Sequence, residues 1–295
     1  MPEIRTVAVI GAGIMGRGIA HAAALGGFRT ILEDILPTSL RRAENEIRSN
    51  LDKAVELGKV DKEKAEAALS RLEYATSLDE AARAADIVIE AVPEEFDSKE
   101  EIFRLLDRIC RPGTVLATNT SSLSITEIAA VTERPEMVVG MYFFNPVHKM
   151  KLIEIVHGKE TGETALNAAV EVGRRMGKET VVIQESPGFI TSRINAMIGN
   201  EAFYMLEAGV ASPEDIDKAI KLGLNHPMGP FEMVDLVGLD TRLNILRYLH
   251  STLGEKFRPA PLLEQYVADG RLGRKAGRGV FDYSVAEAAS GGEQK

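Results

Sequence analysis

The sequence predicts an α/β protein, a doubly wound parallel sheet with an inserted helical pair, followed by an all-α C-terminal domain. Three observations support this fold class. Apolar strands alternate with helices through the first 186 residues, a glycine-rich turn follows the first strand, and the pattern is helical alone from Phe189 to about Ala268. We therefore expect domains at residues 1–186 and 187–284, and a disordered tail at 285–295, which lacks apolar periodicity.

The composition is that of an ordinary globular enzyme, with 45% hydrophobic and 27% charged residues. The net charge of −9 argues against nucleic acid as the main partner, because a phosphate-binding surface needs a basic excess. The single cysteine, Cys110, cannot form an internal disulfide, which fits a reducing cytosol. No apolar run reaches the roughly 18 residues of a membrane helix, and the N-terminus lacks signal-peptide features. We expect a soluble cytoplasmic protein that spans no membrane.

The first strand, Thr6–Ile10, leads into the glycine motif GAGIMG at residues 11–16, and a helix follows at Ile19–Leu25. Gly11 permits a tight turn, Gly13 lets the backbone approach a pyrophosphate, and Gly16 lets helix and strand pack closely. The helix N-terminus offers free N–H groups and a positive dipole end to phosphates.

A second strand, Arg29–Leu32, ends at Glu33 and Asp34, where dinucleotide sites place an acid. Asp34 would accept hydrogen bonds from both adenosine ribose hydroxyls and repel a 2′-phosphate, which favours NAD over NADP. Glu33 should point to the other face of the strand, because side chains alternate. Strand, glycine motif, helix and acid together predict a nucleotide site.

Two helices are predicted before the next strand, one from Pro37 to about Leu57 and one at Asp61–Leu72. The first carries the basic side chains of Arg41, Arg42, Arg48 and Lys53. Two interpretations stay open, a solvated helix face and a platform for the phosphates of a ligand.

Two further apolar strands, Ala85–Val92 and Thr114–Ala117, end in polar residues. The first is followed by Pro93-Glu94-Glu95 and the second by Asn119-Thr120-Ser121-Ser122. Polar strand ends are typical of the carboxyl edge of a parallel sheet, where ligands bind. A capping turn before a helix at Ile125–Val131 would explain the second cluster equally well.

The stretch Val138–Val156 is predicted to form two strands around a turn at Asn145–Pro146. Tyr142 and Glu154 are its groups able to handle a proton, and both have apolar neighbours. Apolar surroundings perturb pKa values, so the pair is a candidate for proton transfer. The alternative is a core hairpin with a satisfied tyrosine and a solvent-facing glutamate.

The remaining elements are a helix, a strand and four helices, expected at Thr164–Met176, Thr180–Ile183, Ile190–Leu206, Ser212–Ile220, Asp235–Leu249 and Leu262–Val267. Ile190–Leu206 is apolar enough for a buried or dimer-forming helix. The five histidines lack metal-ligand spacing and G-x-S-x-G does not occur, so we predict no metal and no such nucleophile.

Several motifs in order, GAGIMG, EAVPE, NTSSLSI, FFNPVHKMKLIEI, SPGFI, HPMGPFEMVDLVGLD and GRKAGRGVFDY, resemble those of L-3-hydroxyacyl-CoA dehydrogenases of the short, 3-hydroxybutyryl-CoA dehydrogenase type. The resemblance covers Thr6 to Tyr283. It implies an N-terminal Rossmann domain that holds NAD, a helical domain that forms a homodimer, and an acyl-CoA substrate. Family enzymes oxidise the 3-hydroxyl of this substrate to a ketone, or reverse the reaction, in β-oxidation and butanoate metabolism.

The resemblance also implies residue roles. A histidine of the FFNP motif takes the hydroxyl proton in the family, and a glutamate, here Glu154, orients it. Ser121 would hold the substrate, Asn145 matches the FFNP asparagine, and Lys53 loosely matches a group that holds CoA phosphates. The implied cofactor-binding residues are Gly11, Gly13, Ile14, Met15, Gly16, Asp34, Glu94, Lys99 and Asn119.

Two positions depart from the family pattern. The family histidine is replaced by Tyr142, and the asparagine after PGF is replaced by Ser192, which still offers a donor and an acceptor. A phenol titrates near pH 10 and an imidazole near 6.5, so Tyr142 would assist ketone reduction better than alcohol oxidation. His148, the nearest histidine, should lie away from the nicotinamide. Three explanations stay open: an introduced substitution, a natural variant with slow or redirected activity, and a non-catalytic NAD- or acyl-CoA-binding module.

Overall fold

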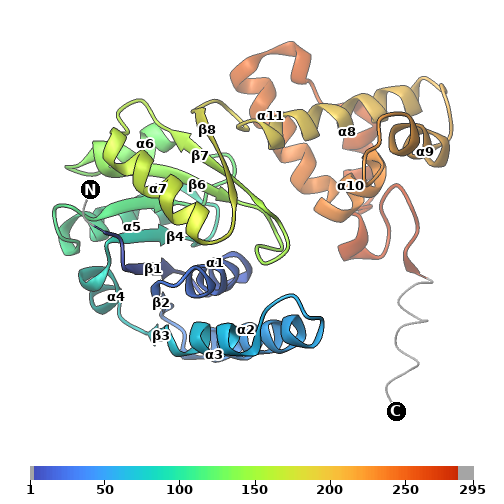
Figure 1. Ribbon diagram of the computed structural model, residues 1–295. Helices are drawn as coiled ribbons and strands as arrows, with labels where there is room; N and C mark the ends of the chain where they lie inside the picture. The colour runs from blue at the N-terminus through green and yellow to red at the C-terminus, as the bar shows by residue number, and fades with distance from the viewer. Residues whose placement is uncertain (1–2, 285–295) are drawn as a thin grey trace. The chain divides into compact units, whose positions relative to one another are not determined.

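The computed structural model describes residues 3–284, and the predicted tail at 285–295 lies outside the described residues. The chain forms two compact units that divide between Phe189 and Ile190. The first unit is a sheet with helices on both faces, and the second is helical (Figure 1). The predicted fold class is confirmed.

The first unit contains an eight-stranded sheet with the strand order β3-β2-β1-β4-β5-β6-β7-β8. Neighbouring strands run parallel except β6 and β7, which form an antiparallel hairpin. The chain builds β1, β2 and β3 outward and then returns to β4 beside β1, so the strand order reverses between β1 and β4. Ligands of doubly wound sheets bind at this point. The strands are β1 (Thr6–Ile10), β2 (Arg29–Glu33), β3 (Leu72–Ala75), β4 (Ile87–Glu90), β5 (Val115–Thr118), β6 (Val138–Phe143), β7 (Leu152–His157) and β8 (Glu179–Gln184).

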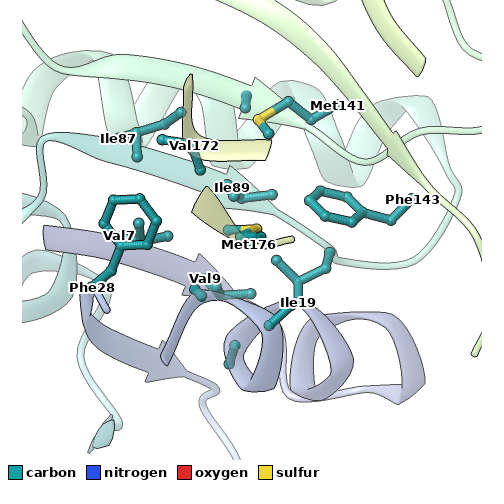
Figure 2. Close-up of a cluster of buried hydrophobic side chains, with 14 of the residues drawn as sticks. Val7, Val9, Ile19, Phe28, Ile87, Ile89, Met141, Phe143, Val172 and Met176 are labelled. Atoms are coloured by element: carbon teal, nitrogen blue, oxygen red, sulfur yellow. The ribbon is translucent and has the colours of Figure 1, made fainter. Parts of the chain in front are cut away.

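Two apolar clusters cover the two faces of the sheet because strand side chains alternate. Val7 and Val9 of β1 join the cluster under α1, α2, α3 and α7, part of which Figure 2 shows. Ala8 and Ile10 of the same strand join the cluster under α4, α5 and α6. The helices are α1 (Ile14–Leu25), α2 (Pro37–Glu56), α3 (Lys62–Ser70), α4 (Leu78–Ala84), α5 (Phe96–Ile109), α6 (Ile125–Ala129) and α7 (Glu163–Arg175), with a 3₁₀ turn at Pro135–Met137.

The helix predicted at Asp61–Leu72 is wrong at its C-terminal end. The structure ends α3 at Ser70, and Leu72–Ala75 forms β3, which pairs parallel with β2. A four-residue strand is too short to show alternation, and its pairing with β2 is a long-range contact that local pattern does not reveal. Helix α4, also not predicted, does carry a local signal, because the Ser77 side chain accepts a hydrogen bond from the Glu80 N–H.

The second unit consists of α8 (Thr191–Glu207), α9 (Pro213–Gly223), α10 (Pro230–Val237), α11 (Leu239–Leu253) and α12 (Pro261–Ala268), with 3₁₀ turns at Glu255–Phe257 and Arg274–Ala276. The single helix predicted at Asp235–Leu249 is wrong, because Gly238 with a φ of +104° separates α10 from α11. In the apolar core of the second unit, the rings of Phe203 and Phe231 meet edge to face, with centroids 5.2 Å apart.

Candidate active site

A tight glycine turn joins β1 to α1. Gly11 has a φ of +97°, and a Cβ there would lie 2.9 Å from the carbonyl oxygen of Ala91. A Cβ on Gly16 would lie 1.7 Å from the carbonyl oxygen of Gly11, so a side chain there would move the turn. A Cβ on Gly13 would meet nothing within 4 Å. Gly13 therefore faces open space, as the approach of a pyrophosphate requires.

The N-terminus of α1 and the carboxylate of Asp34 lie at this turn. Helix α1 begins at Ile14, which is exposed, and its N-cap Gly13 provides no side-chain acceptor, so the first N–H groups can bind an anion. Asp34 Oδ2 accepts a hydrogen bond from the Ala12 N–H at 2.9 Å, and Oδ1 accepts one from the Leu36 N–H at 2.9 Å. Each oxygen keeps a lone pair for a ligand hydroxyl. Met15 packs beside the core of the first unit.

Glu33 precedes Asp34 and is 3% exposed. Burial, with the neighbouring charge of Asp34, raises the pKa of the Glu33 carboxyl from 4.5 to about 7. Glu33 is therefore buried in the protein interior, whereas the carboxylate of Asp34 lies at the glycine turn.

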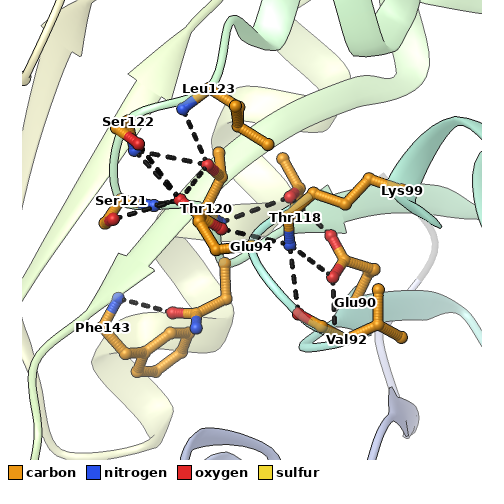
Figure 3. Close-up of polar contacts among 11 residues, drawn as sticks. Glu90, Val92, Glu94, Lys99, Thr118, Thr120, Ser121, Ser122, Leu123 and Phe143 are labelled. Atoms are coloured by element: carbon orange, nitrogen blue, oxygen red, sulfur yellow. Dashed lines mark hydrogen bonds and ion pairs between the residues drawn. The ribbon is translucent and has the colours of Figure 1, made fainter. Parts of the chain in front are cut away.

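A polar network joins the ends of β4 and β5 at the carboxyl edge of the sheet (Figure 3). Glu94 Oε1 accepts hydrogen bonds from the Thr120 hydroxyl at 2.7 Å, the Ser121 N–H at 2.7 Å and the Ser121 hydroxyl at 3.0 Å. The N–H of Ser122 donates to the same oxygen at 3.2 Å. Because the serine hydroxyl has one proton, the oxygen of Ser121 remains an acceptor for a donor on a ligand.

A buried ion pair lies beside this loop. Lys99, 1% exposed, pairs with the fully buried Glu90 at 2.7 Å and with Glu94 Oε2 at 3.4 Å. Glu90 Oε1 also accepts from the Val92 N–H at 2.7 Å, and Oε2 accepts from the Thr118 hydroxyl at 2.6 Å. Burial raises the pKa of the Glu90 carboxyl, and the ammonium of Lys99 opposes that rise.

Asn119 connects the end of β5 to the central hairpin, because its side-chain Oδ1 accepts a hydrogen bond from the Phe143 N–H at 3.0 Å. Its own N–H donates to the Glu90 carbonyl at 2.9 Å. The polar strand ends predicted from sequence therefore meet at one edge.

Tyr142 and Glu154 are direct partners across the β6–β7 hairpin. Side chains of directly opposed residues share a face and have Cβ atoms roughly 4.5–5.5 Å apart. Glu154 is fully buried, which contradicts the alternative of a solvent-facing glutamate. The half-buried Tyr142 ring packs against Phe144 and Phe189, with centroids 4.5 and 5.8 Å away. The hairpin thus holds a phenol and a carboxyl group on one face.

Asn145 lines a cavity of about 230 Å³ between α1, α2 and the turn after β6. Arg17, His21 and His148 also line it, and the two imidazoles stack with centroids 6.0 Å apart. Burial, with repulsion from His148 and Lys178, lowers the pKa of His21 to about 4.

Two predicted substrate residues lie in other parts of the fold. Lys53 lies in the last turn of α2 and, with Arg48 and Ser49, lines an open groove along that helix. Ser192 lies in the first turn of α8, in the second unit. The structure therefore brings together Asp34 with the glycine turn, and Glu94, Lys99, Asn119 and Ser121 at the strand ends.

Glu90 and Thr118 belong to the polar network at the ends of β4 and β5, and the sequence analysis did not predict them as site residues. A signal for Glu90 exists in the sequence, because an acid at the end of the apolar run IVIE needs buried partners. Among residues 3–284, no group of three histidine, cysteine or acidic side chains is arranged to hold a metal ion. Within the same residues no helix is long and apolar enough to cross a membrane.

A glycine turn at the switch point, an acid after the second strand and polar strand ends define the class of doubly wound dinucleotide-binding proteins. The sequence was compared with models of known protein families. The family model of the 3-hydroxyacyl-CoA dehydrogenase NAD binding domain matches residues 6–186, and the family model of the 3-hydroxyacyl-CoA dehydrogenase C-terminal domain matches residues 188–283. The chain therefore belongs to the 3-hydroxyacyl-CoA dehydrogenase family, NAD-dependent oxidoreductases that act on CH–OH groups. An acyl-CoA substrate is consistent with this family.

Whole-length relatives carry related names. The chain is 46% identical over 282 residues to a probable 3-hydroxybutyryl-CoA dehydrogenase of Bacillus subtilis, covering 95% of this chain and 98% of that protein. It is 44% identical to the 3-hydroxybutyryl-CoA dehydrogenase of Bradyrhizobium diazoefficiens, covering 96% and 97%. The crystal structure of (S)-3-hydroxybutyryl-CoA dehydrogenase from Ralstonia eutropha matches with a TM-score of 0.93 at 42% identity, covering 95% and 99%.

Proposed function

We propose that the chain catalyses the NAD-dependent interconversion of 3-hydroxybutyryl-CoA and acetoacetyl-CoA. The relatives' names support this substrate, since similarity extends over nearly the whole of each chain. The observation that carries the chemistry is the opposition of Tyr142 and Glu154 across β6 and β7. Asn119 ties this hairpin to the strand end that holds Ser121.

The glycine turn and Asp34 would hold the cofactor, with the pyrophosphate at the N-terminus of α1 and the adenosine ribose at the carboxylate. Bound NADH supplies the hydride for ketone reduction, and NAD accepts it in the reverse direction. The Glu94 and Lys99 pair would lie near the nicotinamide end.

Tyr142 would donate its phenolic proton to the substrate oxygen as negative charge develops there during reduction. The buried Glu154 on the same face would hold the phenol in position. A phenolic hydroxyl can give its proton to the substrate oxygen, which suits the reduction of a ketone. We therefore propose a reaction biased toward reduction and slower than that of a histidine enzyme, by about 10²–10⁴-fold for poorly placed acid–base help.

The substrate would be held from several elements. Ser121 would accept a hydrogen bond from the 3-hydroxyl of the alcohol or from an amide N–H of the CoA moiety, and Ser192 would contribute a further hydroxyl. Lys53 and Arg48 in the groove of α2 would face the negatively charged phosphates of CoA.

We also propose a homodimer formed through the second unit. Its large apolar side chains at Ile194, Leu222, Leu224 and Leu236 are 50–76% exposed, and association would remove such groups from water. Light scattering on the purified protein tests this, with a monomer mass as the contrary result. The single cysteine, Cys110, is buried, and we place the protein in the cytoplasm, where free thiols persist.

NADH consumption in the presence of acetoacetyl-CoA tests the function directly. We expect turnover with NADH, less with NADPH, and a maximum among ketoacyl-CoA chain lengths at or near four carbons. Tight NADH binding without turnover on any chain length would favour the non-catalytic binding module instead. The whole-length relatives named above are described as dehydrogenases, and this does not favour that alternative.

A further inference from the structure

Glu90 has no role in the function proposed above, although it forms an ion pair with Lys99, which would lie near the nicotinamide end. Both side chains are at most 1% exposed. An ion pair at this depth contributes little net stability, because the cost of removing two charges from water offsets their attraction. Its place at the end of β4, beside the loop that carries Ser121, calls for a different explanation.

Lys99 bridges two carboxylates of different character. Its Nζ lies 2.7 Å from the buried Glu90 and 3.4 Å from Glu94, whose side chain is 39% exposed. Glu90 is held by three donors, the Val92 N–H, the Thr118 hydroxyl and Lys99 itself. Glu90 is therefore the fixed end of the bridge, and it determines where the ammonium lies.

Glu94 is the partly exposed end of the bridge, held at Oε1 by the loop and at Oε2 by Lys99. A partly exposed glutamate samples several rotamers unless both oxygens are held. Here Oε2 faces Lys99, while Oε1 accepts from Thr120 and Ser121. The orientation of the Ser121 hydroxyl thus depends on a carboxylate whose own orientation depends on the ammonium behind it.

We propose that Glu90 is a positioning residue, which fixes Lys99 so that Glu94 holds Ser121 in its substrate-binding orientation. This inference rests on the proposed function, because Ser121 is the residue through which Glu90 would act. Without the Glu90 charge, Glu94 becomes the one carboxylate partner of Lys99 within this bridge. The ammonium would then draw Glu94 away from the loop, and Ser121 would lose its 3.0 Å hydrogen bond.

The test is a double-mutant cycle with Glu90→Gln, Ser121→Ala and the double variant. A misplacement of about 1 Å can cost up to about 100-fold in rate, so we expect Glu90→Gln to lower kcat/KM for acetoacetyl-CoA by 10- to 100-fold. In the Ser121→Ala background the same substitution should cost less than about threefold, since nothing is left to position. The KM for NADH is measured in the same variants, because Glu94 and Lys99 would lie near the nicotinamide end of the cofactor.

A matched control is Asp107→Asn. Asp107 forms a largely buried ion pair with Arg134 at 2.7 Å in the same unit. Its removal should lower the melting temperature and leave kcat/KM unchanged. If Glu90→Gln does not fold, Thr118→Val replaces it, because it deletes one donor to Glu90 without changing a charge. We expect Thr118→Val to lower kcat/KM by a smaller factor. Thr118→Ser, which keeps the hydroxyl donor, should leave kcat/KM at the wild-type value.

Equal losses from Glu90→Gln in the two backgrounds would overturn the inference, since a merely structural role gives additive effects. Calorimetry on the same four proteins gives the dissociation constant of acetoacetyl-CoA. The coupling between Glu90 and Ser121 can then be measured even if the protein has no turnover. Turnover with additive effects refutes the role of Glu90 alone. If the protein neither turns over nor binds acetoacetyl-CoA, the proposed function is refuted, and the role of Glu90 is refuted with it.

Discussion

Replacing Glu33 by glutamine should make the protein more stable than wild type at pH 8 and no more stable at pH 4. Glu33 is 3% exposed and lies next to Asp34, and burial together with this neighbouring charge raises its pKa from 4.5 to about 7. A buried carboxyl group in this setting is stable when neutral and costly when charged.

The sign follows from proton linkage. Below pH 4.5 both the folded and the unfolded chain hold the proton on Glu33, and the full stability is present. Between pH 4.5 and about 7 the folded state alone holds the proton, so stability falls as the pH rises. At about 1.4 kcal/mol per pH unit, the total loss is about 3 kcal/mol, complete above pH 7. Glutamine never ionises and avoids this loss.

Urea denaturation of the two proteins at pH 4, 6 and 8 measures the difference. Glu73→Gln is a matched control on the neighbouring strand, because the hydrogen bond from Arg29 lowers the pKa of Glu73. Its substitution should cost stability at high pH, which is the opposite sign. A Glu33→Gln difference that stays constant from pH 4 to pH 8 would refute the account of this buried acid.

Three further predictions concern cofactor binding and the second unit. Asp34→Ala should weaken NADH binding by roughly 100-fold, from two lost hydrogen bonds to a charged group, and NADPH binding far less; calorimetry with both cofactors checks this, and equal losses would contradict the role of Asp34. Gly13→Ala should keep the melting temperature of wild type but lose NADH affinity, whereas Gly16→Ala should lower both, because only the second Cβ meets protein atoms. Asp235→Ala should cost about 3 kcal/mol or more in unfolding free energy, since it orphans the N–H groups of Val280 and Phe281 and the Tyr283 hydroxyl; a loss below 1 kcal/mol would contradict this estimate.

Local patterns were sufficient to predict most of the fold. The glycine motif, the apolar strands and the hairpin at Val138–Val156 each occupy a short segment whose alternation is visible without its partners. β3 was missed because its four residues are a strand only through pairing with β2. The break at Gly238 was missed because apolar periodicity continues across it, while the backbone there needs a positive φ.

The candidate site was predictable in its parts and not in its connections. Strand ends loaded with polar residues indicated Glu94, Asn119 and Ser121, since carboxyl ends of parallel strands meet at one edge. The choice of partners depended on side-chain geometry that sequence does not contain. No spacing rule indicates that Lys99 bridges Glu90 and Glu94, or that Asn119 accepts from the Phe143 N–H.

The central claim is that Tyr142 assists proton transfer to a 3-ketoacyl-CoA, with NADH as the hydride donor. The most direct measurement is the steady-state rate of acetoacetyl-CoA reduction by wild type, Tyr142→Phe and Tyr142→His, with NADH affinity measured in parallel. We predict slow reduction by wild type, about 10²-fold or more acceleration in Tyr142→His, and a further loss in Tyr142→Phe, at unchanged NADH affinity. Equal rates in all three proteins would contradict a role for this side chain in the reaction.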